Sequence, residues 1–594
     1  MAMMRGIAGK ELPIIGSYDL QRFAQFNPED TANWYRVPNS NSKKGSALYP
    51  SMGRKHINYL GQNVLQFPVE ARANFKTRNF AYYVIGDRVY QIDKNFNTIQ
   101  IANADFQTIA GNVWFAVLYT PALTYVGLTD GVHMYIYTEE TSTFVTVTDP
   151  NLTGNIPHPT YIAVLGNRFV VSSNGKPGFS LSAINLGVTP LLPSTYFTVA
   201  GQAIFAQESG IIRQMTVNQN ILYIFTDFTT GIWANITSTI TAPDGTTSQF
   251  PFKKNTSYEF QWGISSDLSL SVDFGIMAWI GQNQSGLVQP VVSNGQAPQP
   301  ISTKAIDVLF QKSSNMSNVS PFVFFDANGF LYQYENTVFY RLSAGQYQGF
   351  EILDQESNAN SIEYNFDTQE WNRSIELNGE RNRIQKHLYF NNMHLVTVQG
   401  EGTVYQMAGS IYVNEIINPV QSDPPNPQAL DYYIANPFRY ERVTPIISEP
   451  DYGEFKTEWV QIDFVWGDMT FIRQNIPFDN AVYVVAEDGV TFVTDENGNY
   501  ILKEGTSTPD FSSNHYFELF KPSIELYFSN DGGITFQAAD VLQFSDLGVY
   551  SWRMRWYQLG CSRNRVYKLV CVSPAPIVIL GGWQLTERVS GGAA

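Results

Sequence analysis

FAYYVIGDRVYQID (residues 80–93), TYVGLTDGVHMYIY (124–137) and YIAVLGNRFVVSS (161–173) each consist of an apolar run, a tight turn and a second apolar run. The same pattern returns in QMTVNQNILYIF (214–225), FVFFDANGFLYQY (322–334) and HLYFNNMHLVTV (387–398). Short runs rich in Tyr, Phe, Val and Ile that are separated by Gly, Asn and Asp indicate β-hairpins. Helical periodicity is scarce along the chain, so the sequence predicts an all-β protein.

The spacing of these hairpins predicts how they assemble. Their turns lie near residues 86, 130, 166, 219, 328 and 391, and a further hairpin from Trp279 to Val292 fills the longest gap. Intervals of roughly 40–65 residues are closer to the 40–50 residues of a four-stranded propeller blade than to the 8–12 residues between sandwich turns. The segment YNFDTQEW, from Tyr364 to Trp371, is the most blade-like stretch. We therefore predict an irregular β-propeller of six to eight blades.

Proline marks the end of the propeller pattern. QSDPPNPQ (421–428) holds three prolines in eight residues, which excludes a regular element. Strand patterns resume in WVQIDFVW (459–466), AVYVVAEDGVTFV (481–493), SIELYFSNDGGITF (523–536) and RVYKLVCVS (565–573). We expect a propeller over 61–420, a Pro-rich linker over 421–430 and a C-terminal β-sandwich or platform domain over 431–594. Residues 1–60 lack a blade pattern, and we expect them to form an N-terminal extension and ring-closing segment, because the first and last blades of a propeller must be joined.

Composition limits the classes of function. Of the 594 residues, 44% are hydrophobic, 14% aromatic and 15% charged, whereas an ordinary globular chain carries about 25% charged residues. Interface cores are poor in charge and rich in Tyr, Trp and Phe, so we expect obligate assembly. The net charge of -16 argues against a general nucleic-acid binder, because affinity for phosphates comes from Lys and Arg. An acidic protein can still surround DNA that must slide through it.

The sequence has no motif for a metal, a cofactor or export. The histidines show no zinc-site spacing, and neither a P-loop nor a dinucleotide fingerprint occurs; the histidines are His56, His133, His158, His387, His394 and His515. Cys561 and Cys571 are too few for a disulfide scaffold, so we expect free, buried thiols. The N-terminus, MAMMRGIAGKELPIIG, has no signal-peptide h-region, and no long uncharged apolar run occurs. We expect a chain without cofactors or enzymatic activity that is made and assembled in the cytoplasm.

The most enzyme-like motif is SNDGGITF, from Ser529 to Phe536, which has the pattern of the Asp-box turn known from sialidases. Its Asp side chain can cap the turn, Gly533 can take a positive φ and Phe536 can plug the core. The single copy lies outside the predicted propeller, and sialidase chemistry also needs an arginine cluster and a Tyr nucleophile that we cannot assign. We therefore favour a structural turn over a glycosidase site.

Residues 551–569 reverse the charge of the rest of the chain. They contain no acid and five basic residues, namely Arg553, Arg555, Arg563, Arg565 and Lys568. One interpretation is a patch that meets an acidic neighbouring subunit or phosphates; the other is a strand pair whose alternate arginines face solvent. Four arginines would lie together only if the outward faces of the two strands coincide. The interface and fold positions that we expect to matter are Trp279, Trp371, Trp552, Arg553, Arg555, Trp556, Arg563 and Arg565.

Several segments, taken in order, resemble one family. They are NPEDTANWYRVPNSNSKKGSALYPSMG (27–53), QWGISSDLSLSVDFGIMAWIGQNQSG (261–286), VVSNGQAPQPISTKAI (291–306) and YSWRMRWYQLGCSRNRVYKL (550–569). Their order and spacing are similar to those of the tail-hub or nozzle proteins of short-tailed bacteriophages, a group also known as packaged-DNA stabilisation or head-completion proteins. The insert from Thr229 to Pro251 and the tail from Glu587 onward depart from that pattern and are candidates for host-specific attachment.

The resemblance implies a structural virion protein. It implies a homo-oligomeric ring, with six subunits, below the portal and its adaptor ring, which retains packaged DNA and gives it an exit channel at ejection. Tail fibres, spikes or a needle would be further partners, and DNA would pass without sequence-specific binding or membrane insertion. The alternatives are a glycan-binding or glycan-degrading propeller of a phage tail and a bacterial surface or scaffold propeller.

Overall fold

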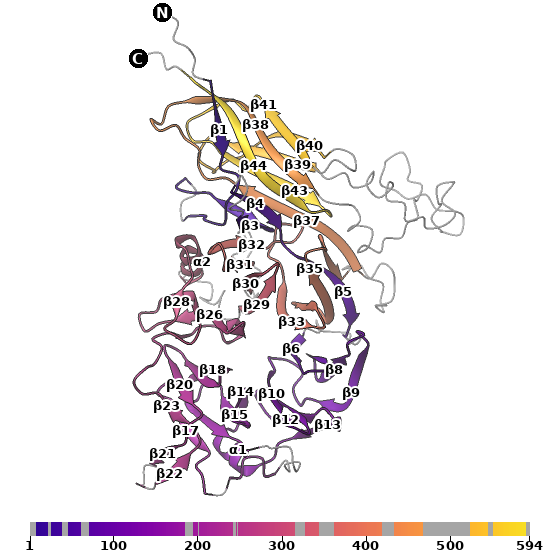
Figure 1. Ribbon diagram of the computed structural model, residues 1–594, viewed down its shortest axis with the longest axis vertical. Coiled ribbons are helices and arrows are strands. Elements are labelled where there is room, and N and C mark those ends of the chain that lie inside the picture. The colour runs from indigo at the N-terminus through magenta and orange to yellow at the C-terminus, as the bar shows by residue number, and fades with distance from the viewer. Residues whose placement is uncertain are drawn as a thin grey trace, which may run out of the picture.

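The computed structural model describes residues 7–21, 25–38, 45–60, 71–184, 194–199, 201–241, 245, 247–314, 327–343, 361–417, 433–466, 523–544 and 551–589. They form a ring of small sheets and, beside it, a two-layered β-sandwich at which both ends of the chain lie (Figure 1). The expected fold class, an all-β chain with an irregular propeller and a C-terminal sandwich, is confirmed. No helix in these ranges is long and apolar enough to span a bilayer.

The propeller has seven blades, because five separate sheets are completed by two parts of a fourteen-stranded sheet. The first three blades are β6 (Ala71–Lys76), β7 (Ala81–Ile85), β8 (Arg88–Ile92) and β9 (Thr98–Asp105); β10 (Trp114–Tyr119), β11 (Thr124–Thr129), β12 (Met134–Thr138) and β13 (Thr143–Thr146); and β14 (Pro159–Leu165), β15 (Arg168–Ser173), β16 (Gly178–Leu181) and β17 (Phe205–Gln207). A short helix, α1 (Pro150–Asn155), precedes the third blade.

The remaining blades continue in chain order. The fourth is β18 (Ile212–Asn218), β19 (Ile221–Thr226), β20 (Thr230–Ala234) and β23 (Lys253–Lys254), with an inserted hairpin of β21 (Ser238–Thr241) and β22 (Thr247–Phe250). The fifth is β24 (Gly263–Ile264), β25 (Ser271–Asp273), β26 (Ile276–Gln282), β27 (Val288–Ser293) and β28 (Gln299–Pro300), with the short helix η1 (Asp267–Ser269), and α2 (Lys304–Ser314) follows it. The sixth is β29 (Asn328–Tyr334), β30 (Thr337–Ser343), β31 (Ser361–Asn365) and β32 (Glu370–Arg373).

Four of the blades open with the same kind of hairpin. Both residues of the turn have positive φ in Gly166–Asn167, Gln219–Asn220, Glu335–Asn336 and Asn391–Asn392. Two-residue turns of this type match the right-handed twist of the flanking strands, and Gly and Asn tolerate the left-handed conformation best. The turns near residues 166, 219 and 391 that the sequence predicts are therefore confirmed.

The turn predicted near residue 328 is wrong. Asn328 and Gly329 lie inside strand β29, and the turn of this hairpin is at Glu335–Asn336. A Cβ on Gly329 would lie 2.3 Å from the backbone oxygen of Ser269, so the glycine allows a close approach between two blades. Glycine in a strand often marks such an approach of another backbone rather than a turn.

The last blade is closed by a strand from the other end of the chain. It consists of β33 (Ile384–Phe390), β34 (Met393–Val398), β35 (Thr403–Ala408) and β5 (Gly53–Tyr59). β5 pairs antiparallel with β35, from Tyr59 opposite Thr403 to Gly53 opposite Ala408. β33 lies against β6 of the first blade, so the ring is closed without a covalent bond.

The sandwich also combines both ends of the chain. One sheet contains β1 (Ile7–Leu12), β3 (Trp34–Pro38), β4 (Ser46–Pro50), β44 (Ile577–Arg588), β38 (Phe455–Trp466), β41 (Ser551–Tyr557) and β42 (Cys561–Ser562). The facing sheet contains β37 (Tyr433–Val443), β43 (Val566–Ser573), β39 (Ser523–Ser529) and β40 (Gln537–Gln543). β2 (Asp30–Ala32) and β36 (Val413–Ile417) connect β37 to blades six and seven. The predicted linker at 421–430 and the predicted strand at 481–493 lie outside the described residues.

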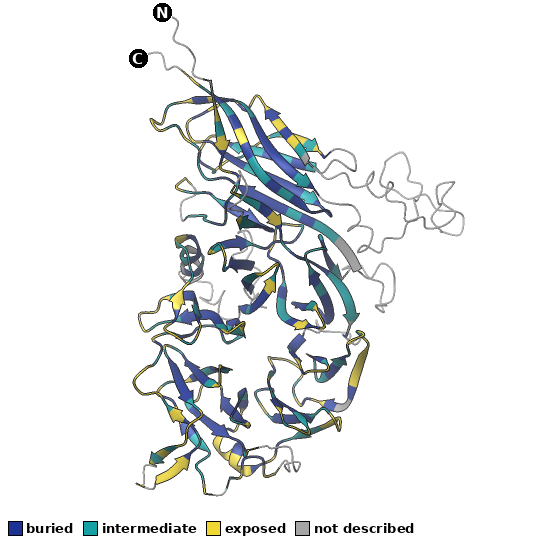
Figure 2. Cartoon of the chain, in the orientation of Figure 1, coloured by how far each residue is buried: buried dark blue, intermediate teal, exposed yellow. Residues whose placement is uncertain are grey.

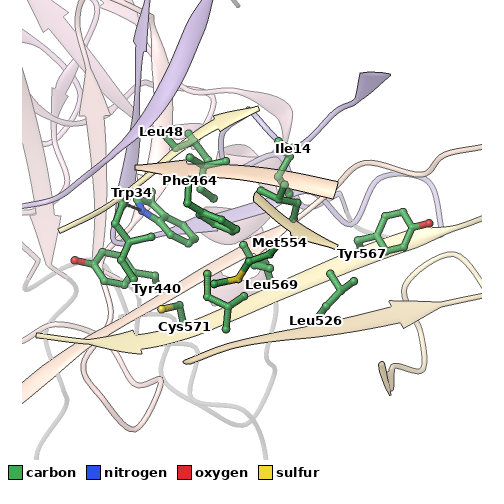
Figure 3. Close-up of a cluster of buried hydrophobic side chains, with 14 of the residues drawn as sticks. Ile14, Trp34, Leu48, Tyr440, Phe464, Leu526, Met554, Tyr567, Leu569 and Cys571 are labelled. Carbon is green, nitrogen blue, oxygen red and sulfur yellow. Dashed lines mark hydrogen bonds between the residues drawn. The ribbon is translucent and has the colours of Figure 1, made fainter. Parts of the chain in front are cut away.

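Side chains from both ends of the chain fill the core between the two sheets (Figure 3). Trp34 is fully buried there, stacks on Tyr440 at 4.9 Å and donates from its indole nitrogen to the carbonyl of Ile577 at 2.7 Å. Each buried side chain of this size stabilises the fold by about 1.5–3 kcal/mol. Both cysteines are free, as expected, and Cys571 lies in this core, but Cys561 is exposed, so burial was predicted wrongly for it.

Candidate functional site

A buried arginine joins the sandwich to the N-terminal segment. Arg442 on β37 is fully buried and donates from Nε to the carbonyl of Ile14 at 2.7 Å. Its Nη1 donates to Thr31 Oγ1 at 3.0 Å, and its Nη2 donates to Glu29 Oε1 at 2.7 Å. Burial lowers the pKa of Arg442 from its ordinary value, and the nearby Glu29 opposes that effect. The guanidinium therefore holds three stretches of chain together through charge-assisted hydrogen bonds.

The same junction extends into the propeller. β2 lies between β32 of blade six and β37 of the sandwich, with Ala32 opposite both Arg373 and Glu441. Arg373 donates from Nε to Asp30 Oδ1 at 2.8 Å, and its Nη2 lies 3.6 Å from Glu441 Oε2. A continuous sheet with ion pairs thus crosses from one domain to the other and connects the propeller to the sandwich.

A second buried arginine supports the strand that closes the ring. Arg54 on β5 is fully buried and donates from Nη1 to Glu376 Oε1 at 2.8 Å and to Asn382 Oδ1 at 3.2 Å. Its Nε donates to the carbonyl of Glu415 at 3.1 Å. Removing one partner of such a pair would leave an uncompensated buried charge. β5 is therefore held by a charged network as well as by its ladder with β35.

Two of the expected tryptophans are core residues of the blades. Trp279 on β26 is fully buried, donates to the carbonyl of Gly263 at 3.0 Å and packs edge-on against Phe225 of the fourth blade. Trp371 on β32 is also fully buried, and its indole nitrogen donates to the carbonyl of Ile301 at 2.8 Å. Each indole thus fixes the packing of its own blade against a neighbouring segment.

The next four expected residues lie together on β41, but they point to opposite sides of the sheet. Trp556 is buried in the sandwich core and donates to the carbonyl of Asp540 at 3.0 Å, and Trp552 packs against that core. Arg553 and Arg555 point away from the core and are exposed. Arg555 stacks over the ring of Trp459 at 4.9 Å and donates from Nε to Gln461 Oε1 at 2.7 Å. β41 therefore presents arginines on its outward side only.

The last two arginines do not complete one patch of four. Arg563 is exposed on the turn between β42 and β43, whereas Arg565 is fully buried. Arg565 donates to the carbonyl of Leu559 at 2.6 Å and to that of Gly560 at 3.1 Å, and its guanidinium lies 4.9 Å from the ring centre of Phe528. Burial lowers its pKa. β41 and β43 lie in different sheets, so their outward faces do not coincide. Arg565 stabilises the turn before β42 through its hydrogen bonds to Leu559 and Gly560.

The Asp-box forms the expected turn. Asp531 accepts hydrogen bonds from the backbone nitrogens of Ile534 and Thr535 at 3.1 and 3.0 Å and from the hydroxyl of Thr535 at 2.6 Å. Hydrogen bonds from Ser529 and Thr535 lower the pKa of this carboxyl. Gly533 has a φ of +94°, as predicted, but Phe536 is only half-buried rather than a core plug. The motif lies in the sandwich and locks a hairpin there.

Two of the six histidines, His387 and His394, form a pair in blade seven. His387 Nε2 and His394 Nδ1 are 2.9 Å apart at the boundary of blades six and seven, and the ring of His387 stacks on Phe330. Burial lowers the pKa of both imidazoles. Within the described ranges, no three His, Cys, Asp or Glu side chains lie close enough to hold a metal ion. His515 lies outside those ranges.

Sequence reasoning missed the paired arginines of the junction and of the ring closure, of which Arg442 and Arg54 are buried and Arg373 is half-buried. Arg442 lies in a strand with several apolar and aromatic residues, PFRYERV at 437–443, whereas the strands of Arg54 and Arg373, GRKHINY and EWNR, are mostly polar. A charge in an otherwise apolar strand is a usable signal, because such a side chain is rarely buried unless it is paired. The partners, at positions 29, 30 and 376, are too distant in the sequence to be recognised from the pattern.

Comparisons with known proteins address the propeller. Residues 68–322 match the family model of phage stabilisation proteins described as Bacteriophage P22 Gp10, beta-propeller, and this range spans the first five blades. No curated protein matches the chain.

Solved structures similar to the chain include several propellers. One is the Pan2 WD40 domain of Neurospora crassa, with 7% identity over 60% of this chain and 94% of that chain and a TM-score of 0.33. Another is the Cps50 (Swd1) propeller of Myceliophteria thermophila, with 8% identity over 60% and 99% and a TM-score of 0.32. At these TM-scores, the fold assignment rests on the seven blades and on the family match. That match confirms the resemblance to the tail-hub proteins of short-tailed phages, and the chain is a structural phage tail protein whose propeller is similar to that of Gp10.

Proposed function

We propose that the chain is a subunit of the tail-hub or nozzle ring below the portal and adaptor, where it retains packaged DNA and gives it an exit channel at ejection. The observation that carries this proposal is the match of five consecutive blades to the phage stabilisation family of Gp10. The proposed role is mechanical, without catalysis and without a cofactor.

The construction of the subunit supports a mechanical role. Within the described residues, each of the seven blades has at least four paired strands, and β5 completes the last one from the N-terminal side. Arg442, Arg373 and Arg54 join the blades, the N-terminal segment and the sandwich through buried or half-buried ion pairs. A ring around pressurised DNA must transmit force between the domains of its subunits. A continuous sheet with ion pairs suits that task better than a flexible linker.

The proposed partners follow from this role. They are further copies of the chain in a homohexamer, the adaptor ring, and tail fibres, spikes or a needle. Phage DNA would pass through the channel without sequence-specific binding, since a chain with a net charge of -16 has little general affinity for phosphates. We place assembly in the host cytoplasm and the finished protein in the virion tail, without membrane insertion.

Electron microscopy with mass determination tests the proposal, on the purified chain and on virion tails. We expect a ring of six copies with an axial channel at the tail. A chain that stays monomeric, is absent from the tail axis and binds glycans on an array would contradict the ring and favour the glycan-binding or glycan-degrading alternative.

A further inference from the structure

The outward side of one sandwich sheet carries a group of aromatic and arginine side chains. On β38, Val460, Ile462 and Phe464 are fully buried in the core, so the residues between them face outward. The pairing of β41, β38, β44 and β1 then sets two rows across this face, Tyr557–Trp459–Leu585–Gly9 and Arg555–Gln461–Trp583–Glu11. We call this surface the outer sheet face; Arg553, next to Asp463, belongs to it as well. β1, β44, β38 and β41 lie side by side in Figure 1, and Figure 2 shows exposed positions on β41 and β44.

The outer sheet face combines exposure with fixed side chains. Tyr557 is 60% exposed and Trp583 is 47% exposed. Arg555 is held by its stacking on Trp459 and by its hydrogen bond to Gln461, whose Nε2 donates in turn to Asp463 Oδ1 at 2.9 Å. Trp, Tyr and Arg are the residues that most often dominate binding energy at protein interfaces. Side chains that are ordered before binding lose less conformational entropy when a partner arrives.

The chemistry of this surface selects a partner with a carboxylate. Arg555 uses Nε for its hydrogen bond to Gln461, and its two Nη groups are the further donors with which a guanidinium can bind a carboxylate in bidentate geometry. The chain has 53 acidic and 37 basic residues, so a second copy offers carboxylates in excess. One of them, Glu11, is exposed in the same row at the opposite edge of the same sheet. A Cβ on the neighbouring Gly9 would meet no atom within 4 Å.

The strand directions make the two edges complementary. β41, β38, β44 and β1 are antiparallel to each successive neighbour, so β1 runs in the direction of β38 and opposite to β41. In the part of the chain that the structure describes, β41 has a ladder only with β38 and β1 only with β44. Placing β1 of a second copy beside β41 would therefore extend the sheet in its existing antiparallel order. An edge strand of this kind is a template for pairing with another chain.

We propose that β41 of one copy lies beside β1 of the next copy, with Arg555 paired to Glu11 and with Trp583 of the second copy beside them. This inference rests on the proposed ring and names the surface that builds it. The contact is head-to-tail, because two different edges of the sheet meet, and such contacts close into rings when the rotation between copies allows it.

A charge exchange between the two edges tests the contact. The dissociation constant of the oligomer is measured by mass photometry and analytical ultracentrifugation for the full chain, for Arg555→Glu, for Glu11→Arg and for the double variant. Each single variant places like charges at the contact and should weaken assembly at least about tenfold, whereas the double variant should return to within about threefold of the original chain. Arg563→Glu is the matched control, because it reverses an exposed arginine of the same domain away from the outer sheet face.

The outcomes separate this contact from the proposed ring. If the original chain assembles and neither single variant weakens it, the contact is overturned and the ring stands. Weakening by both single variants without recovery in the double variant overturns the pairing of Arg555 with Glu11. A chain that stays monomeric at all concentrations overturns the ring and the contact together. Circular dichroism and thermal unfolding of each variant should match the original chain, because both side chains are exposed.

Discussion

The propeller and the sandwich are built from the same kind of strand but in different ways. Six of the blades form from strands that follow one another in the chain, such as β6 to β9 between residues 71 and 105. The sandwich pairs β1, at residues 7–12, with β44, at residues 577–588, and the buried Trp34 donates to the carbonyl of Ile577 within the same sheet. Blade seven is intermediate, because only its strand β5 comes from far away. The propeller therefore depends mostly on local pairing, whereas the sandwich depends on contacts between the two ends of the chain.

The largest effect expected from this comparison is that of Trp34→Ala. It removes a fully buried indole and its hydrogen bond from the sandwich core, which should cost about 5 kcal/mol of unfolding free energy. Because Trp34 and β5 belong to the same N-terminal segment, hydrogen exchange should also increase in blade seven. Trp279→Ala removes an equally buried indole from the propeller, and its effect on exchange should stay within blades four and five. Unchanged protection of blade seven in Trp34→Ala would contradict this coupling.

The next largest effect concerns the joint between the two regions. Arg442→Met should destabilise the chain by about 4 kcal/mol, because it leaves Glu29 and several carbonyls without their buried partner. Denaturant unfolding followed by tryptophan fluorescence measures this loss. Arg563→Met is the control, because an exposed arginine should change stability by no more than about 0.5 kcal/mol. Equal stability of the two variants would show that the buried network does not hold the domains together.

This difference between the regions explains what the sequence could predict. The turns at Gly166–Asn167, Gln219–Asn220 and Asn391–Asn392 are encoded by neighbouring residues, and their spacing allowed the propeller to be predicted. The turn predicted at Gly329 was wrong, because this glycine allows a close approach to Ser269, a residue far away in the chain. The entry of β1, β3 and β4 into the sandwich has no local signal either, because it depends on pairing with β44. For the same reason, the arginines on β41 were recognised, but the burial of Arg565 was not.

Acid should affect the propeller through its histidine pair. Burial lowers the pKa of both His387 and His394 and so favours their neutral forms, and His394 and Lys76 add to the effect on His387. Phe330, Tyr332 and Tyr389 are the other side chains whose rings lie against the pair.

As the pH falls below the ordinary histidine pKa of 6.5, the unfolded chain binds protons at these two histidines more readily than the folded chain, in which their pKa is lowered. The stability that depends on the neutral pair is therefore present above pH 6.5 and is lost as the pH falls below it. We expect a loss of about 1–2 kcal/mol between pH 7 and pH 5. His387→Phe should reduce this loss, and denaturant unfolding at a series of pH values measures it. An identical pH dependence in the variant would exclude the pair as its cause.

The smallest expected effect is that of Asp531→Ala in the Asp-box. The turn is local, exposed and recognisable from its sequence, and Asp531 stabilises it by accepting hydrogen bonds from Ile534 and Thr535. Their loss should cost about 1 kcal/mol, because neutral groups at the surface can bond to water instead. The pKa of Asp531 is lowered in the fold, so its contribution is present above the ordinary value of 3.8 and disappears as the pH falls below it. Thermal unfolding at pH 7 and pH 3 measures both effects. If contacts between distant segments contribute most of the stability of the sandwich, the loss at pH 7 must be smaller than that of Arg442→Met. An equally large loss would contradict this view, because Asp531 belongs to a local motif that is recognisable from the sequence.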